Sequence, residues 1–218
     1  MINYNRGGTG LFGLTLPEHF LLDFIGLYEL IKIGYLVVSS NLGLIEDNLL
    51  RYSDGGGLQD IQHIEGIVDI VVPSFEKEEV YCIAGSMGVT NTLNLLRRKR
   101  VSHERVCFIS GNYNERISLA DNPQVKKFKQ TYYDTENPQE LYFRSPLDWF
   151  DKLPTKLNYL LLHGFDDIKT PATQAYKFAN LAQKNNRVSL HIYPDNHPLR
   201  EYRADVKRKI VDFITNHK

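Results

Sequence analysis

Two hydrophobic periods alternate along the chain, and together they predict alternating strands and helices. Short, continuous apolar runs predict buried strands at residues 2–5, 35–40, 80–84, 105–109, 157–162 and 188–193. Apolar positions that recur every three or four residues predict helices over residues 17–33, 58–72, 87–99, 171–184 and 199–216. Residues from about 111 to 150 are rich in Asn, Pro, Tyr and charge, which predicts an irregular helical insertion.

This order of elements favours an α/β fold. Strands that alternate with helices form a mostly parallel, doubly wound sheet whose two faces are both covered. The sequence contains no internal repeat and no low-complexity linker, so we expect residues 1–218 to form a single domain. In such sheets ligands bind beyond the carboxyl ends of the strands. Candidate chemistry is therefore sought in the residues that follow each strand.

Composition excludes several classes of partner. Lys and Arg total 26, as do Asp and Glu, so the formal net charge is zero and neither nucleic acid nor an anionic membrane is favoured. The basic run Arg97–Arg100 closes a predicted helix, where cations complement the helix dipole. Cys82 and Cys107 lie in apolar runs and are too few for a disulfide framework. With no leader-like segment or membrane span, we expect a cytoplasmic protein that needs no metal or cofactor.

The segment Ala84–Gly88, with the sequence Ala-Gly-Ser-Met-Gly, stands between the third predicted strand and its helix. A sharp strand-to-helix turn exposes the serine hydroxyl above the sheet, and small residues on either side let the turn close. Ser86 is thus a candidate nucleophile, and the Met87 amide, at a helix N-terminus, is a candidate oxyanion donor. The alternative is that Ser86 only caps the helix.

A serine nucleophile needs a base and a carboxylate that orients the base, and on this fold they follow in the order Ser, acid, His. The fifth strand runs into Asp166 and Asp167, and the sixth strand runs towards His197. Spacing alone does not choose between the two aspartates. His163 ends the fifth strand, where a histidine more often bonds to the backbone.

A glycine-rich loop follows the first strand. In a hydrolase the Gly7–Gly8 backbone would supply the second oxyanion donor. Residues 8–13 also spell G-x-G-x-x-G, the dinucleotide fingerprint. The predicted helix begins only at Pro17, however, and the next strand ends without an acidic residue for a ribose, so the nucleotide interpretation is a remote alternative.

These motifs resemble the catalytic domain of the prolyl-oligopeptidase-type serine hydrolases, which have the α/β-hydrolase fold. The resemblance rests on the oxyanion loop, the serine elbow and the segments around the acid and the base: Arg6–Gly8, Phe12–Gly13, Ala84–Gly88, Ser145–Leu147, Leu161–Gly164, Asp167, Pro171, Gln174, Tyr193–Pro194 and His197. It implies a triad of Ser86, Asp167 and His197, with oxyanion donors at Met87 and in the Gly7–Gly8 loop. It selects Asp167 over Asp166, because the family's acid lies four residues after the histidine of its His-Gly motif.

The chain departs from the family in three places. We expect it to lack the first strands of the usual eight, to carry no β-propeller, and to read Asn41–Leu44 where the family shows an arginine-glycine motif. The leading hypothesis is a serine hydrolase, a peptidase or esterase, that cleaves a small ester or short peptide through an acyl-enzyme. The alternative is an inactive binding protein with the same fold. An exposed sheet edge would also favour pairing with a second chain.

Overall fold

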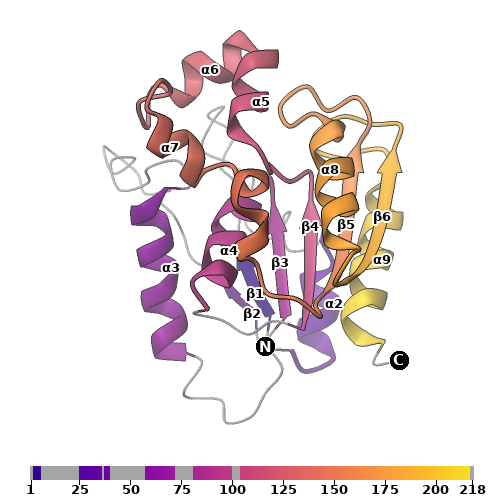
Figure 1. The fold of residues 1–218 in the computed structure, drawn as a ribbon. Coiled ribbons are helices and arrows are strands. Elements are labelled where there is room, and N and C mark those ends of the chain that lie inside the picture. Colours follow the sequence, from indigo (N-terminus) through magenta and orange to yellow (C-terminus); the bar gives the residue numbers. More distant parts are fainter. Residues whose placement is uncertain are drawn as a thin grey trace, which may run out of the picture.

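A computed structural model describes residues 2–5, 25–35, 37–39, 57–71, 81–99 and 104–216. Its strands form one parallel sheet in the order β2-β1-β3-β4-β5-β6 (Figure 1). The strands are β1 (Ile2–Asn5), β2 (Val37–Ser39), β3 (Tyr81–Gly85), β4 (Arg105–Ile109), β5 (Asn158–Gly164) and β6 (Arg187–Tyr193). Every neighbouring pair is parallel. The predicted α/β architecture and its six strands are confirmed.

Helices cover the sheet and its carboxyl edge. Between the strands and after the last of them lie α2 (Leu27–Lys32), α3 (Leu58–Val71), α4 (Met87–Arg97), α8 (Ala172–Ala182) and α9 (Arg203–Thr215). The segment between β4 and β5 forms the short helices α5 (Glu115–Asp121), α6 (Pro123–Lys129) and α7 (Pro138–Phe143) and the 3-10 helix η3 (Pro146–Lys152). Helices α5, α6 and α7 lie beyond the strand ends at the top of Figure 1. None of the helices within the described ranges is long and apolar enough to cross a membrane.

Successive strand residues point to opposite faces of the sheet, and each face has its own core. On one face Cys82, Ala84 and Phe108 pack with α4, α8 and Trp149 of η3. On the other face Ile83 and Cys107 pack with α2 and α9. Because both faces are apolar, the strands read as continuous hydrophobic runs rather than alternating ones.

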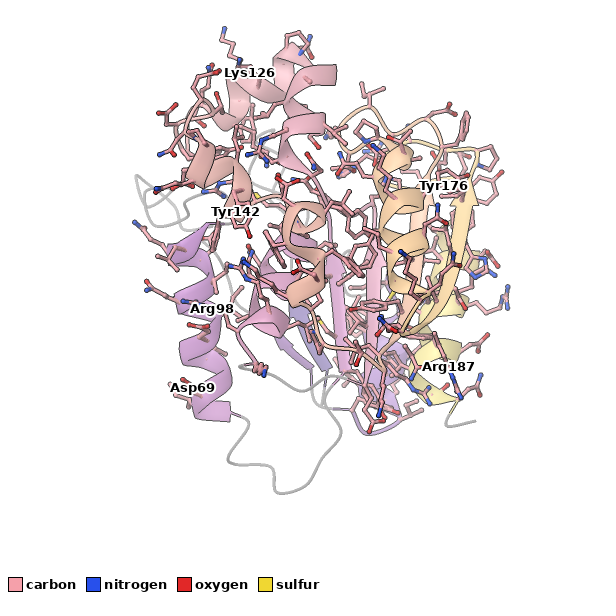
Figure 2. The ribbon with its side chains drawn as sticks, in the orientation of Figure 1. Asp69, Arg98, Lys126, Tyr142, Tyr176 and Arg187 are labelled. Atoms are coloured by element: carbon pink, nitrogen blue, oxygen red, sulfur yellow. The ribbon has the colours of Figure 1, made fainter. Side chains whose placement is uncertain are left out.

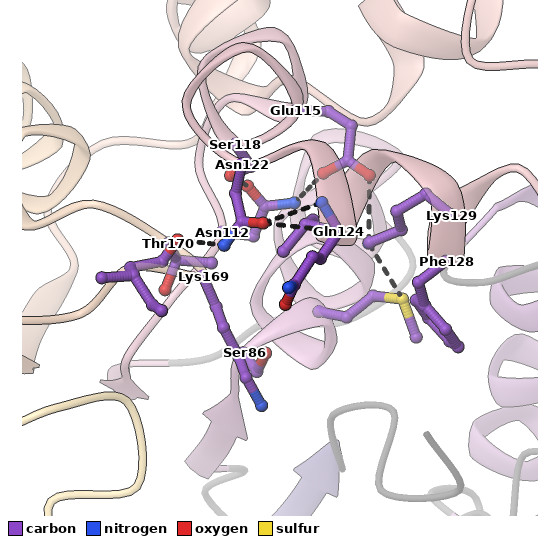
Figure 3. A pocket seen from close by; sticks show the side chains of 13 residues that line it. Ser86, Asn112, Glu115, Ser118, Asn122, Gln124, Phe128, Lys129, Lys169 and Thr170 are labelled. Carbon is purple, nitrogen blue, oxygen red and sulfur yellow. Dashed lines mark hydrogen bonds and ion pairs between the residues drawn. The ribbon is translucent and has the colours of Figure 1, made fainter. Parts of the chain in front are cut away.

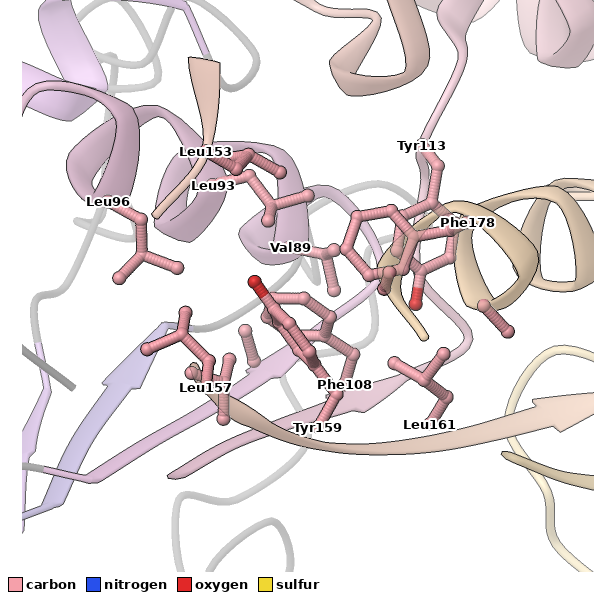
Figure 4. Close-up of a cluster of buried hydrophobic side chains, with 14 of the residues drawn as sticks. Val89, Leu93, Leu96, Phe108, Tyr113, Leu153, Leu157, Tyr159, Leu161 and Phe178 are labelled. Atoms are coloured by element: carbon pink, nitrogen blue, oxygen red, sulfur yellow. The ribbon is translucent and has the colours of Figure 1, made fainter. Parts of the chain in front are cut away.

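Aromatic rings form the centre of the first core (Figure 4). Tyr113, Phe178, Phe108 and Tyr159 are all fully or almost fully buried. The rings of Tyr113 and Phe178 stack with their centroids 4.6 Å apart, while Phe108 and Phe178 meet edge to face at 6.1 Å. These contacts join the segment after β4 to α8, so the insertion is anchored to the sheet at its first residues.

Several predicted boundaries differ from the structure by a few residues, and two of these differences have a clear cause in the backbone. The last helix begins at Arg203 rather than Leu199, since Leu199 is a buried residue with a φ of 50° and ends a turn instead. Helix α4 ends at Arg97 rather than Lys99, whose φ of 55° is incompatible with a right-handed helix. Of the helix predicted over 17–33, residues 27–32 are helical, and residues 17–24 lie outside the described part.

Arg97 and Arg98, in the described part of the basic run at the end of α4, have structural roles. Arg98 pairs with Glu65 of α3 at 2.9 Å, and Figure 2 shows it beside that helix. Arg97 lies over the ring of Trp149 at 4.2 Å. These two arginines therefore attach α3 and η3 to α4.

Candidate active site

Ser86 occupies a strained turn between β3 and α4. Its φ and ψ are 52° and −121°, a conformation that costs a non-glycine residue on the order of 1–3 kcal/mol. The Ser86 amide donates to Ile109 O at 2.9 Å, and Asn112 N donates to Ser86 O at 3.2 Å, so β4 holds the turn in place. Ser86 makes no side-chain capping bond to α4. The interpretation of Ser86 as a simple helix cap is therefore wrong, and its hydroxyl is directed elsewhere.

The hydroxyl meets a histidine that is itself bonded to a carboxylate. His197 Nε2 lies 3.0 Å from Ser86 Oγ, and His197 Nδ1 lies 2.7 Å from Asp167 Oδ2. Both distances are hydrogen bonds. The turn after β3, the loop after β5 and the loop after β6 thus bring together three residues that are 81 and 30 positions apart along the chain. Asp166 is exposed, and it is Asp167 that contacts the imidazole.

Asp167 is buried, with 3% of its surface exposed, and several donors surround it. The backbone amides of Lys169 and Thr170 donate to Oδ1 at 2.9 and 3.0 Å, and Thr170 Oγ1 lies 2.8 Å from Oδ2. Burial alone raises the pKa of this carboxyl, but hydrogen bonds from His163 and His197 and their charges outweigh it and hold the pKa far below its ordinary value. Asp167 is therefore ionised and suited to orient His197.

His163 makes two contacts, of which only the one to the backbone was expected from its place at the end of a strand. As expected for a histidine that ends a strand, its Nε2 lies 2.7 Å from a backbone oxygen, that of Thr170. The same atom also lies 3.3 Å from Asp167 Oδ2. Asp167 is thus flanked by two imidazoles, and the fixed spacing of four residues from His163 to Asp167 was the only signal for this contact.

The loop that carries His197 is fixed by contacts with neighbouring strand ends. Gly164 lies so close to it that an added Cβ would stand 2.5 Å from Asn196 O and closer still to Asp195 O. Ser110 Oγ donates to the carbonyl of His197 at 2.6 Å, and Asp195 accepts from the amide of Glu201 at 3.0 Å. The position of the imidazole is therefore set by packing and by hydrogen bonds to its own loop.

The expected oxyanion donors are described only in part. Met87 is the first residue of α4, and the first amides of a helix have no partner within it. Its N–H is therefore available beside Ser86, at the positive end of the helix dipole. Gly7 and Gly8, like the whole of the Gly8–Gly13 fingerprint, lie outside the described residues.

A cavity of about 170 Å³ opens beside Ser86. Its lining comes from three places: Ser86 and Met87, the segment from Asn112 to Lys129, and the loop from Ile168 to Thr170 (Figure 3). An engineered apolar cavity of ~150 Å³ holds a benzene ring, so this space suits one medium-sized side chain or a short acyl group.

A buried ion pair stands in the cavity wall. Glu115 is fully buried, and its Oε1 lies 3.0 Å from Lys129 Nζ, which is itself 3.7 Å from Met87 Sδ (Figure 3). Asn112 and Tyr133 also donate to the two carboxylate oxygens. Burial raises the pKa of Glu115, but the charge of Lys129 and these hydrogen bonds together lower it below its ordinary value. Composition and periodicity gave no signal for this pair, because its members lie 14 residues apart on two short helices.

The aromatic residues of the insertion could have roofed a pocket or packed the short helices, and the structure shows packing. Tyr113 and Trp149 are buried in the core, Phe143 packs against α3 and α4, and Tyr133 bonds to Glu115. None of these lines the cavity, whose aromatic contribution is Phe128. Among the described residues, no group of His, Cys, Asp and Glu side chains is arranged to hold a metal ion.

Serine hydrolases of the α/β-hydrolase fold have a parallel, doubly wound sheet, and at its carboxyl edge lie a strained serine, a histidine and a buried aspartate. This chain has the same arrangement. The chain belongs to one family of them: the sequence profile of the prolyl oligopeptidase family matches residues 77–218, more than half of its length. No curated protein matches the sequence significantly.

Solved structures share the fold at low sequence identity. An esterase of Pyrococcus furiosus superposes with a TM-score of 0.65 at 15% identity, covering 98% of this chain and 81% of its own. An acylaminoacyl peptidase of Pyrococcus horikoshii gives 0.69 at 19% identity, covering 97% and 35%. A puromycin-hydrolyzing peptidase of Mycobacterium tuberculosis gives 0.72 at 15% identity, covering 96% and 32%. The chain thus spans about a third of the two peptidases and most of the esterase.

Proposed function

We propose that this serine hydrolase cleaves an ester or amide bond through an acyl-enzyme, with Ser86 as nucleophile, His197 as general base and Asp167 as the residue that orients His197. The observation that carries the proposal is the chain of two hydrogen bonds from Ser86 Oγ to His197 and from His197 to Asp167. A serine hydroxyl becomes a competent nucleophile when a base within hydrogen-bond reach takes its proton.

In the first half of the reaction, Ser86 Oγ forms a bond to the carbonyl carbon while its proton passes to His197 Nε2. The negative charge that develops on the carbonyl oxygen is stabilised by the Met87 amide and by a second amide from the Gly7–Gly8 loop. His197 then returns the proton to the leaving oxygen or nitrogen as the old bond breaks. Asp167 stays ionised and stabilises the imidazolium.

In the second half, water attacks the acyl-enzyme. His197 accepts one proton from the water and passes it to Ser86 Oγ as the acid product leaves, so the free enzyme is restored. The substrate would be a small ester or a short peptide, as the names of the esterase and peptidase with similar folds also suggest. A cavity of about 170 Å³ beside Ser86 is in keeping with a substrate of that size.

Labelling with a fluorophosphonate probe tests the mechanism directly. The probe should modify Ser86, identified by peptide mass spectrometry, and the Ser86→Ala variant should lose both labelling and hydrolysis of 4-nitrophenyl acetate. Ser189→Ala is a matched control, because Ser189 lies exposed on β6 away from the site and its loss should change neither readout.

The competing hypothesis is a binding protein that keeps the fold without the chemistry. A hydrogen bond of 3.0 Å between Ser86 Oγ and the imidazole argues against it, because a site without chemistry has no need of this alignment. Labelling of the wild type no stronger than that of Ser86→Ala would overturn the proposed mechanism and favour the binding protein.

A further inference from the structure

The ion pair between Glu115 and Lys129 in the cavity wall carries a large desolvation cost. Moving a carboxylate and an ammonium out of water costs several kcal/mol per ion, and apolar residues of similar volume are often as stabilising. Glu115 is nonetheless fully buried and Lys129 has 11% of its side chain exposed. A costly pair that lines the cavity beside a reactive serine points to a role in recognising what enters the cavity.

Glu115 is already satisfied by this chain. Lys129, Tyr133 and Asn112 all donate to its two oxygens, and no solvent reaches its side chain. An incoming cation could not approach that carboxylate without displacing one of these donors. Glu115 therefore fixes the position of Lys129 rather than binding a substrate itself.

The Lys129 ammonium has a donor that its contacts with the described residues do not use. Its ammonium has three N–H groups, and within the described residues they meet Glu115 Oε1 at 3.0 Å and the weakly accepting Met87 Sδ at 3.7 Å. At least one N–H is left for a group in the cavity. Lys129 and Met87 both line the cavity that opens beside Ser86, so that donor belongs to the wall of the space that an acyl group bound to Ser86 would enter (Figure 3).

We propose that Lys129 is a specificity-determining residue that selects substrates whose acyl side chain carries a neutral hydrogen-bond acceptor, such as a carboxamide. The inference rests on the proposed acyl-transfer function. A hydrocarbon side chain would leave the spare N–H desolvated and unpaired, and sites built to hydrogen-bond a substrate reject analogues that lack the group. A carboxylate would compete with buried Glu115 for one cation, and an ammonium would be repelled by Lys129.

Four 4-nitrophenyl esters of one size class test the proposal: those of N-acetylated glutamine, norleucine, glutamate and lysine. They share a leaving group, so differences in kcat/KM report the acyl side chain. We expect the wild type to favour glutamine over norleucine by roughly tenfold or more, the range for a hydrogen bond to a charged group. Glutamate and lysine should both be poorer than glutamine.

Variants of the pair should then move the preference in defined directions. The double variant Glu115→Gln with Lys129→Met removes both charges together and should bring the ratio of glutamine to norleucine to one or below. Glu115→Gln alone frees the charge of Lys129 and should shift the preference to glutamate. Lys127→Met, an exposed lysine on the same helix, is the matched control and should keep the wild-type ratio.

Two outcomes overturn the inference while the proposed function stands. In the first, the wild type hydrolyses the norleucine ester through Ser86 with the same kcat/KM as the glutamine ester. In the second, the preference for glutamine survives in the double variant. The first needs no variant, so it holds even if a substitution prevents folding. Failure of Ser86-dependent hydrolysis of all four esters, with no fluorophosphonate labelling, would instead overturn the proposed function and this inference with it.

Discussion

Replacing Gly164 with alanine should displace His197, the proposed general base, without changing His197 itself. The new Cβ would stand 2.5 Å from Asn196 O, and side-chain carbons do not approach backbone oxygens within 3.0 Å. The loop that carries His197 must therefore retreat by about 0.5–0.9 Å to restore ordinary contact distances. A misplacement of ~1 Å can cost a hundredfold in rate, so we expect kcat/KM to fall by roughly 10- to 100-fold. Overpacking should also cost about 1–3 kcal/mol of stability.

The assay is hydrolysis of 4-nitrophenyl acetate, with the free energy of unfolding from urea denaturation. Gly66→Ala is the matched control: Gly66 is exposed within α3, and its added Cβ meets nothing within 4 Å among the described residues. In that variant the free energy of unfolding should rise by about 0.5–1 kcal/mol, because alanine is the better helix former, and the activity should stay at the wild-type level. Wild-type activity and stability in Gly164→Ala would refute the argument that the close approach of the two loops positions His197.

Three further outcomes follow from the same contacts. Ser110→Ala removes the bond to the carbonyl of His197 and should lower the free energy of unfolding by about 1 kcal/mol and reduce kcat/KM, checked by urea denaturation and ester hydrolysis; unchanged values would show that the bond is dispensable. Thr170→Val loses a donor 2.8 Å from Asp167 and should lower kcat while KM changes little, which steady-state kinetics measures. An unchanged kcat would show that this donor is not needed. Because folding lowers the pKa of Asp167, its ionised form stabilises the fold at pH values above its ordinary pKa of 3.8, and this contribution is lost as the pH falls below 3.8. The difference in Tm between wild type and Asp167→Asn should therefore shrink below about pH 4. A difference that stays constant down to pH 3 would contradict that account.

The sheet and the convergence of Ser86, Asp167 and His197 could be predicted from the sequence because both follow from local patterns. Apolar runs such as residues 105–109 mark strands, and parallel strands bring their carboxyl ends to one edge, so Ser86, Asp167 and His197 could be placed near one another before any distance was known. The choice of Asp167 over Asp166 needed family resemblance, because neighbouring residues on a loop carry no periodic signal.

The cavity wall was not accessible in the same way. Glu115 and Lys129 look like ordinary surface residues of short polar helices, and only the packing of α5 against α6 turns both inward. Nor did the pattern show that Leu199 adopts a positive φ, because that conformation is imposed by the contacts of its loop. Non-local packing decided both features, and a single sequence carries little information about it.

The Asn112–Lys129 stretch and the reactive groups have separate origins in the chain, and this separation has an evolutionary consequence. In the proposed mechanism the protons move between residues on three loops of the central sheet. Most of the described residues that line the cavity beside them belong instead to one continuous stretch, which leaves the sheet after β4 and is anchored by Tyr113. On the proposed mechanism, we therefore expect that a single recombination or a few substitutions within that stretch would change which acyl group is accepted while the reaction itself is retained. Laboratory evolution of selectivity should start there, with Ser86, Asp167 and His197 left unchanged.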